Sequence, residues 1–167
     1  MREAIVRWDA AIDRAVDRAR NPVLDGIVYR LSSAADHSLL WDLCGTATAI
    51  ARDDFGFAVR FIAAMGAESL LTNGVVKTAF RRVRPAEYED ISFSYGLRRP
   101  ITSSFPSGHA TAAFCAARLL GGGAGWYTLA AAVASTRVYV RLHHASDVVA
   151  GAAFGLVLGS ALRRFVR

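Results

Sequence analysis

The amino-acid sequence predicts an all-α protein, a polytopic membrane helical bundle with about five spanning helices and amphipathic N-terminal helices. Three observations lead to this prediction. Hydrophobic residues make up 53% and charged residues 20% of the chain, and the mean hydropathy is +0.28, so the apolar residues must be gathered in long runs. Apolar side chains recur at helical spacing near the N-terminus, and five apolar stretches follow. The 167 residues suit a single domain, with an amphipathic interfacial region at 1–36 and a helical bundle at 37–167.

The N-terminal region has the pattern of two amphipathic helices. Apolar residues recur three and four positions apart from Ile5 to Ala19, with arginine and aspartate on the other side. Asn21-Pro22 should end this helix, and a second amphipathic segment runs from about Val23 to Ala35. Both fit helices that lie at a membrane surface or pack on a bundle, and the early charges predict no cleavable signal peptide.

Five apolar stretches, at 38–51, 55–80, 108–120, 125–142 and 147–162, are the candidate spans. Several are shorter than the ~20 residues that cross a bilayer, and most contain a charge. Such charges are costly unless they face a bundle interior, a cavity or the interface. We therefore expect Glu68 to pair with Arg60 or another arginine. A soluble helical bundle is the alternative interpretation.

Aromatic and glycine positions favour the membrane interpretation. Trp41 and Trp126 begin the first and fourth stretches, as in interfacial aromatic belts. Gly151, Gly155 and Gly159 form a repeated small face that lets helices pack closely.

The remaining composition excludes several functions. Cys44 and Cys115 both lie in apolar stretches, which predicts core residues rather than a disulfide framework or a thiolate metal site. Lys77 is the one lysine beside 19 arginines, a bias that indicates genome composition and no nucleic-acid partner.

Three polar clusters lie after the second apolar stretch, at the start of the third, and around the turn between the fourth and the fifth. Alternating spans would bring all three clusters to one side of the membrane. The clusters are Lys77 with Arg84-Pro85, then Pro106-Ser107-Gly108-His109, then Arg137 with His143 and Asp147. Together they supply three cations, a hydroxyl, a helix-start amide, two imidazoles and a carboxylate. This set suits a tetrahedral oxyanion.

The three clusters also match a family pattern, K-x6-R-P, P-S-G-H and S-R-x5-H-x3-D. The sequence therefore resembles the type 2 phosphatidic acid phosphatase superfamily of lipid phosphatases, related to vanadium haloperoxidases and bacterial acid phosphatases. Two departures are visible: Thr136 replaces the usual serine, and the segment between the second and third motifs is short. Larger soluble haloperoxidases and soluble acid phosphatases fit the apolar stretches poorly.

The resemblance implies a role for each motif residue. His143 would attack phosphorus, and His109 would protonate the leaving alkoxide and later activate water. On a shared helix the four-residue spacing would let Asp147 hold one nitrogen of His143. The phosphate oxygens would be bound by Lys77, Arg84, Arg137, the Ser107 hydroxyl and the Gly108 amide. No metal and no other cofactor is expected.

Other polar residues near the motifs receive different assignments. His144 should project away from its neighbour and take no part in the reaction. Arg81, Arg82, Arg98 and Arg99 are expected to set topology, with an anionic headgroup as the alternative. The loop at 86–105 is a possible lid.

Arginine counts predict the orientation and favour one substrate. With the phosphate-binding cations set aside, more arginines lie on the active-site side, which places the site at the cytoplasmic face of the inner (plasma) membrane.

The small size and the 143–147 block resemble compact family members assigned to decaprenylphosphoryl-5-phosphoribose phosphate hydrolysis, a step toward a cell-wall arabinose donor. The implied partners are a membrane lipid phosphate and the lipid bilayer. Alternatives are polyprenyl diphosphate, phosphatidic acid or phosphatidylglycerol phosphate, or a non-catalytic lipid-binding protein.

Overall fold

The structure is a computed structural model, and it describes residues 1–86 and 100–167. The described residues form helices and no strand, in the order α1 (Arg2–Ala19), α2 (Pro22–Ala34), η1 (Asp36–Ser38), α3 (Leu39–Ala51), α4 (Phe55–Ser69), η2 (Leu70–Val75), η3 (Val76–Ala79), α6 (Gly108–Leu119), α7 (Ala124–Tyr139) and α8 (Ala145–Val166). The segment η2 is a π-helix, and η1 and η3 are 3₁₀-helices. The expected all-helical class is confirmed.

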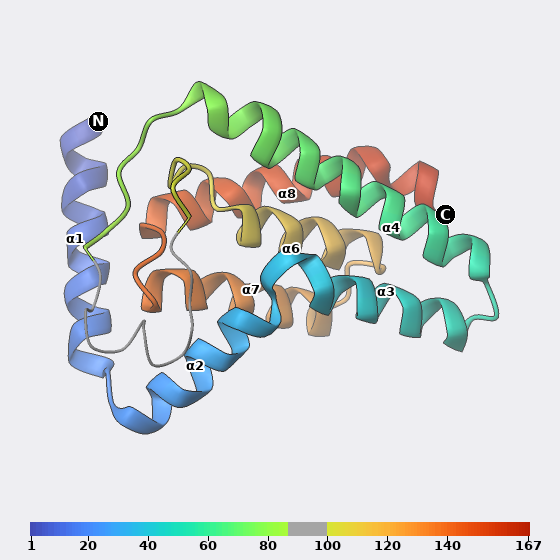
Figure 1. The fold of residues 1–167 in the computed structure, drawn as a ribbon, viewed down its shortest axis with the longest axis horizontal. Helices are drawn as coiled ribbons and strands as arrows, with labels where there is room; N and C mark the ends of the chain where they lie inside the picture. The colour runs from blue at the N-terminus through green and yellow to red at the C-terminus, as the bar shows by residue number, and fades with distance from the viewer. Residues whose placement is uncertain (87–99) are drawn as a thin grey trace.

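Helix α6 is the centre of the bundle. It packs against α8, α7, α4 and α3, and most of its side chains are small and buried. Figure 1 shows α4 and α8 running along one side of α6, with α7, α2 and α3 on the other. Helix α1 crosses the end of the bundle where α7 finishes and α8 begins, and it contacts both. Because the predicted motifs follow or open α4, α6 and α8, this packing brings their ends together.

Local capping explains where several helices begin and end. The side chain of Asn21 accepts a hydrogen bond from the amide of Leu24 (3.0 Å), directly before Pro22 at the first turn of α2. The side chain of Asp54 accepts from the amide of Phe57 (2.8 Å) at the start of α4. Gly121 has a φ of +119°, in the turn that ends α6. The predicted break at Asn21-Pro22 is confirmed.

The glycine face of α8 packs on the backbone of α6, as the sequence predicts. A Cβ added at Gly151 would lie 2.6 Å from the carbonyl oxygen of Ser107, and one at Gly159 would lie 2.9 Å from that of Cys115. A Cβ at Gly155 would collide with the carbonyl oxygen of Thr111. Larger residues at these positions would push the two helices apart.

Two helical segments within the described residues are long and apolar enough to cross a membrane, Phe55–Ala79 with 25 residues and Ala145–Val166 with 22. Helices α3, α6 and α7 have 13, 12 and 16 residues. Five spans are therefore not confirmed by length. The 55–80 stretch also differs from one regular span, because η2 and η3 interrupt the α-helical pattern before Lys77.

Helix α1 meets the bundle mainly with its acidic side, and of its apolar residues Val16 packs against the bundle. Asp9 is its only buried residue, at 3% exposure, whereas Ile5 and Trp8 are 41% and 44% exposed. Of the two expected arrangements, packing on the bundle is therefore observed, and it leaves apolar side chains of α1 uncovered.

Candidate active site

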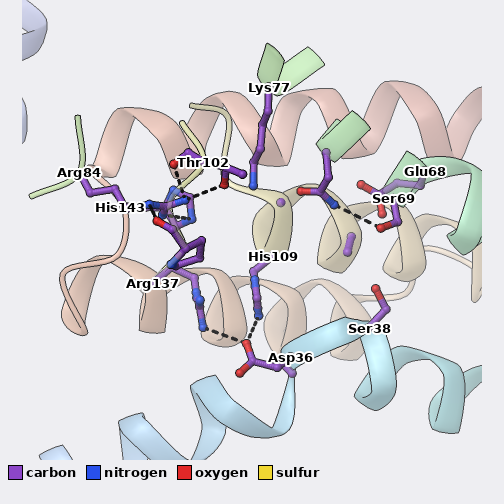
Figure 2. Close-up of a pocket in the computed structure, with 15 residues that line it drawn as sticks. Asp36, Ser38, Glu68, Ser69, Lys77, Arg84, Thr102, His109, Arg137 and His143 are labelled. Atoms are coloured by element: carbon purple, nitrogen blue, oxygen red, sulfur yellow. Dashed lines mark hydrogen bonds and ion pairs between the residues drawn. The ribbon is translucent and has the colours of Figure 1, made fainter. Parts of the chain in front are cut away.

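A cavity of about 690 Å³ opens at the end of the bundle where the three motifs meet (Figure 2). Six of the eight predicted site residues line it: Lys77, Arg84, Gly108, His109, Arg137 and His143. Ser107 and Asp147 are fully buried beside it. Three cations around one cavity, opposed by the carboxylates of Asp36 and Glu68, provide a positive field that favours a phosphate.

His143 lies in the turn before α8, and its neighbours determine its tautomer. Its Nδ1 is 2.6 Å from the carbonyl oxygen of Ser104, which can only accept, so Nδ1 carries the proton. Its Nε2 is 3.3 Å from Nη1 of Arg84, which can only donate, so Nε2 offers a lone pair. Burial lowers the pKa of His143 well below its ordinary 6.5, and the charges of Arg84, Arg137 and Lys77 lower it further. The imidazole is therefore neutral at physiological pH, with a nucleophilic nitrogen beside the cations.

Backbone carbonyl groups hold Arg84 in place. Its Nη1 donates to the carbonyl oxygen of Leu142 (2.6 Å), and its Nη2 donates to those of Thr102 and Ser103 (3.2 Å each). Only 8% of this residue is exposed. The guanidinium is thus fixed next to His143 before any substrate arrives, which is the preorganisation that transition-state stabilisation requires.

The structure corrects the expected contact between His143 and Asp147. Helix α8 begins at Ala145, so the two residues do not share a helix face, and Nδ1 of His143 is 3.9 Å from Oδ2 of Asp147, too far for a hydrogen bond. Oδ2 instead accepts from the backbone amide of His144 (2.9 Å). Asp147 therefore holds the turn that carries His143, while the Ser104 carbonyl orients the imidazole.

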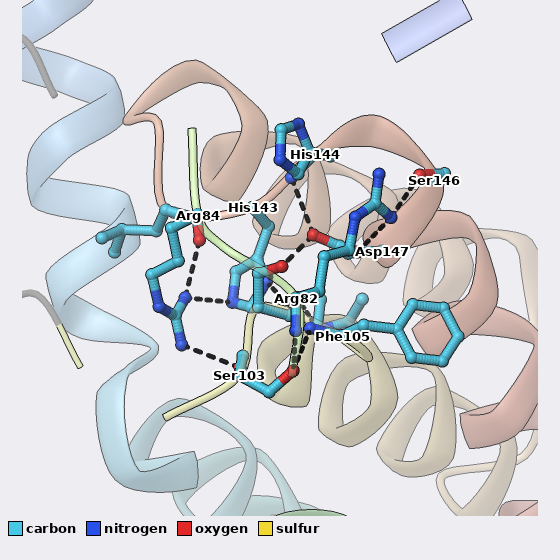
Figure 3. Close-up of polar contacts among 12 residues, drawn as sticks. Arg82, Arg84, Ser103, Phe105, His143, His144, Ser146 and Asp147 are labelled. Carbon is cyan, nitrogen blue, oxygen red and sulfur yellow. Dashed lines mark hydrogen bonds and ion pairs between the residues drawn. The ribbon is translucent and has the colours of Figure 1, made fainter. Parts of the chain in front are cut away.

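Arg82 connects Asp147 to helix α1. Figure 3 shows the contacts of Arg82 with Asp147 and Ser146. Its Nη1 donates to Oδ1 of Asp147 (2.6 Å), and its Nη2 donates to Oδ2 of Asp9 (2.7 Å). Asp9 also accepts from the amide and the hydroxyl of Ser146 (2.8 and 2.7 Å). Burial alone would raise the pKa of Asp9, but the hydrogen bonds from Ser146 and Arg82 outweigh it and lower the pKa. Arg82 is thus an internal ion-pair partner, and its expected role in topology stays a prediction.

Asp36 connects the second and third motifs, because it contacts His109 and Arg137. The sequence patterns do not single it out. Its Oδ1 is 2.8 Å from Nε2 of His109 and 3.6 Å from Nη1 of Arg137. The carboxylate accepts from His109, which leaves Nδ1 as the nitrogen not engaged by Asp36. Nη1 of Arg137 also donates to the hydroxyl of Ser32 (2.6 Å), whereas its buried Nε has no hydrogen-bond partner among the described residues. A buried, unpaired donor next to the cavity is suited to an anionic ligand.

The start of α6 combines a helix N-terminus with the side chain of Lys77. The hydroxyl of Ser107 accepts from the amide of Ala110 (3.4 Å), so it caps α6 instead of lining the cavity. A Cβ at Gly108 would lie 3.0 Å from Oδ1 of Asn73 and 3.4 Å from Nζ of Lys77. The missing side chain thus leaves room for the ammonium group beside the helix start, where an anion is favoured.

Two further expectations meet different outcomes. Glu68 is 2% exposed and accepts from the hydroxyl of Thr72 (2.8 Å), whereas Arg60 contacts Asp54 (3.4 Å), so the expected Glu68–Arg60 pair is wrong. His144 binds the carbonyl oxygen of Val83 (3.2 Å) and does not line the cavity, in line with its exclusion from the reaction.

Arg98 and Arg99 lie outside the described residues, as does most of the 86–105 loop, the candidate lid. No group of three or more His, Cys, Asp or Glu side chains able to hold a metal occurs in the described ranges.

These features define a membrane phosphatase. The sequence pattern of the PAP2 superfamily matches residues 57–167, two thirds of the chain, and the chain belongs to this superfamily. It is accordingly a phosphoric monoester hydrolase.

One curated relative and two solved structures are similar to the chain. Decaprenylphosphoryl-5-phosphoribose phosphatase of Mycobacterium tuberculosis is 29% identical over 167 residues, which cover 96% of this chain and 92% of the relative. The crystal structure of the transmembrane PAP2 type phosphatidylglycerolphosphate phosphatase from Bacillus subtilis matches 97% of this chain and 86% of that one, with a TM-score of 0.76 and 24% identity. Aquifex aeolicus LpxE matches 93% and 94%, with a TM-score of 0.74 and 27% identity.

Proposed function

We propose that the protein hydrolyses the terminal phosphomonoester of a membrane lipid through a phosphohistidine intermediate, with decaprenylphosphoryl-5-phosphoribose phosphate as its substrate. The observation that carries the chemistry is the neutral Nε2 of His143, which lies at a cavity lined by three cations. The observation that supports the substrate is the similarity over nearly the whole chain to the mycobacterial phosphatase of that name.

In the first step, Nε2 of His143 attacks phosphorus and the bond from phosphorus to the ester oxygen breaks. His109 gives a proton to that departing oxygen. Lys77, Arg84 and Arg137 bind the three equatorial oxygens as their charge grows, and the amide of Gly108 adds the field of the α6 N-terminus.

In the second step, water attacks the phosphohistidine and the phosphorus–nitrogen bond breaks. His109, which has lost its proton, now takes one from the water, so the site returns to its starting state with inorganic phosphate released. Asp36 holds Nε2 of His109 through both steps. Asp147 keeps the turn before α8 in place through the amide of His144. All groups named here belong to the chain, and we propose that the reaction needs no metal ion.

The release of phosphate would serve the synthesis of a cell-wall arabinose donor, because the product is a polyprenyl-linked ribose free of its 5-phosphate. Polyprenyl diphosphate, phosphatidic acid and phosphatidylglycerol phosphate carry the same terminal phosphate chemistry and are the alternative substrates. A non-catalytic lipid-binding role is disfavoured because His143, His109 and Asp147 are all present.

We also propose that residues 1–167 form one domain with five spans in the inner membrane and an active site facing the cytoplasm. The exposed Ile101 lies in the sequence between Pro100 and Thr102, which both line the cavity, and offers a position for labelling. In a background without Cys44 and Cys115, an I101C variant should react with an impermeant maleimide only after cells are opened. Labelling of intact cells would place the site on the outer face instead.

The central experiment is phosphate release by the purified protein in EDTA, with the phosphoribose lipid and the three alternative lipids as substrates. Preference for the phosphoribose lipid, abolished in His143→Ala, is the expected result. Preference for the diphosphate would make the protein a carrier-lipid recycler. Loss of all activity in EDTA would contradict metal-free catalysis, and release from no substrate under any condition would favour a non-catalytic role.

A further inference from the structure

The cavity is larger than a phosphate group requires. A water molecule takes up roughly 30 Å³ of liquid, so 690 Å³ corresponds to roughly twenty water volumes, whereas a phosphate has only five heavy atoms. Figure 2 shows Arg84, His143 and Thr102 at one end of the cavity and Glu68, Ser69 and Ser38 at the other. The second end is therefore open to the group that carries the phosphate.

Glu68 is an unusual residue to find at that second end. It is 2% exposed and lies in the apolar segment Phe55–Ala79, where an ionisable side chain is expensive unless it has a functional partner. Its carboxylate has about four acceptor positions. Within residues 1–86 and 100–167, its side chain accepts one hydrogen bond, from the hydroxyl of Thr72 (2.8 Å). Because Glu68 lines the cavity, its remaining acceptor capacity is available to a ligand there.

Ser69 and Asn73 extend this polar end toward the phosphate site. The amide nitrogen of Asn73 donates to the hydroxyl oxygen of Ser69 (3.2 Å), and both residues line the cavity. A Cβ built on Gly108 would lie 3.0 Å from Oδ1 of Asn73 and 3.4 Å from Nζ of Lys77, so both polar groups lie beside this glycine. A row of polar side chains thus runs from Glu68 to the ammonium group of Lys77. It consists of Glu68, Ser69, Asn73 and Lys77, and the last three are four residues apart, about one helical turn.

This donor and acceptor set matches a polyhydroxylated group. A sugar hydroxyl can donate to the Glu68 carboxylate and accept from the Ser69 hydroxyl or the Asn73 amide, whereas an alkyl chain can do neither. We propose that Glu68, Ser69 and Asn73 form a hydroxyl-binding subsite that selects substrates whose terminal phosphate is carried by a sugar or a similar polyol. The proposal rests on the phosphatase function proposed above and adds the residues that recognise the headgroup.

The test compares lipid phosphates with and without hydroxyl groups near the terminal phosphate. Decaprenylphosphoryl-5-phosphoribose phosphate and dodecyl phosphate are the first pair of probes, and the 2-deoxyribose analogue of the former, which lacks a single hydroxyl group, is the stricter comparison. The measured quantity is the preference, the ratio of kcat/KM for the ribose lipid to that for the comparison lipid. We expect Glu68→Gln to lower the preference at least tenfold and Ser69→Ala to lower it about threefold or more. Asp42→Asn, which neutralises a carboxylate on α3 outside the cavity, is the matched control and should leave the ratio within twofold.

Equal losses on all lipids in Glu68→Gln would show that the carboxylate supports the fold or Lys77, and would overturn the proposal. A wild-type ratio near one would also overturn it while leaving the phosphatase function intact. Calorimetry on the His143→Ala variant with ribose 5-phosphate and with 2-deoxyribose 5-phosphate repeats the comparison without turnover, so a protein that releases no phosphate still gives a result. Weaker binding of the deoxy compound, lost in Glu68→Gln, supports the subsite, and equal binding refutes it.

Discussion

Replacing Arg82 with alanine should lower both the stability and the turnover number of the enzyme. The side chain donates to Asp147 at 2.6 Å and to Asp9 at 2.7 Å, and these two carboxylate side chains are only 0% and 5% exposed. A hydrogen bond to a charged group contributes about 1.5–3 kcal/mol. Because the Arg82 side chain itself is 28% exposed, solvent screening places each bond near the lower end of that range. The substitution should therefore cost about 3 kcal/mol of unfolding free energy.

The same reasoning gives the effect on catalysis. If the bond to Asp147 helps to hold the turn before α8 in the transition state, losing about 1.5 kcal/mol there slows kcat by about tenfold. Phosphate release and chemical unfolding in detergent measure the two effects. Arg141→Ala is the matched control, since Arg141 also holds α1, through ion pairs with Asp13 (2.9 Å) and Asp17 (2.7 Å).

The control separates the two ways in which Arg82 could act. Arg141→Ala should reduce stability but change kcat by less than threefold. If it slows kcat as much as Arg82→Ala does, the loss comes from undocking of α1, and the reasoning about Asp147 is refuted. A double-mutant cycle with Asp9→Asn adds a second check, because a coupling energy near zero would mean that the pair contributes nothing.

Two further predictions concern the histidines. Because the pKa of His143 in the folded protein lies well below 6.5, the unfolded chain takes up this proton first, so His143 makes stability fall as pH drops below 6.5 and leaves it constant above. The pH slope of the unfolding free energy should be shallower in His143→Asn between pH 5 and 6.5, and equal slopes would contradict a neutral, buried imidazole. Asp36→Asn should slow hydrolysis of an alkyl phosphate about tenfold or more by disturbing the general acid His109, but should affect p-nitrophenyl phosphate much less, because that leaving group needs no proton. Similar losses on both substrates would assign Asp36 to phosphate binding through Arg137.

Local sequence signals predicted most of the fold. The break at Asn21-Pro22 and the gaps between apolar stretches at 52–54 and 121–124 each depend on residues within a few positions of one another, and all three are observed as breaks between helices. The apolar stretches likewise predicted the helices. The π-helical segment at Leu70–Val75 was missed, because its divergence from an α-helix depends on packing against the rest of the bundle and not on a local pattern.

In the candidate site, too, the residues marked by local sequence patterns were predicted, and those that depend on long-range contacts were not. Residues with spaced motifs were found from the sequence, and six of the eight line one cavity. Asp36 was missed because it lies 73 positions from His109 and no spacing links them. The Ser104 carbonyl group that orients His143 left no mark in the sequence, since every residue has one. The spacing of His143 and Asp147 suggested a shared helix face, which fails because α8 begins between them.

The glycine face of α8 has a mechanical consequence. Through this face α8 packs closely on the backbone of α6 along the length of both helices. The amide of Ser107 also donates to the carbonyl oxygen of Asp147 (3.1 Å), which joins the starts of the two helices. The anion-binding end of α6 and the turn that carries His143 thus belong to one stiff frame. A bilayer that thins or thickens would tilt the outer helices around this frame, and the distance from the nucleophile to the bound phosphate would stay the same.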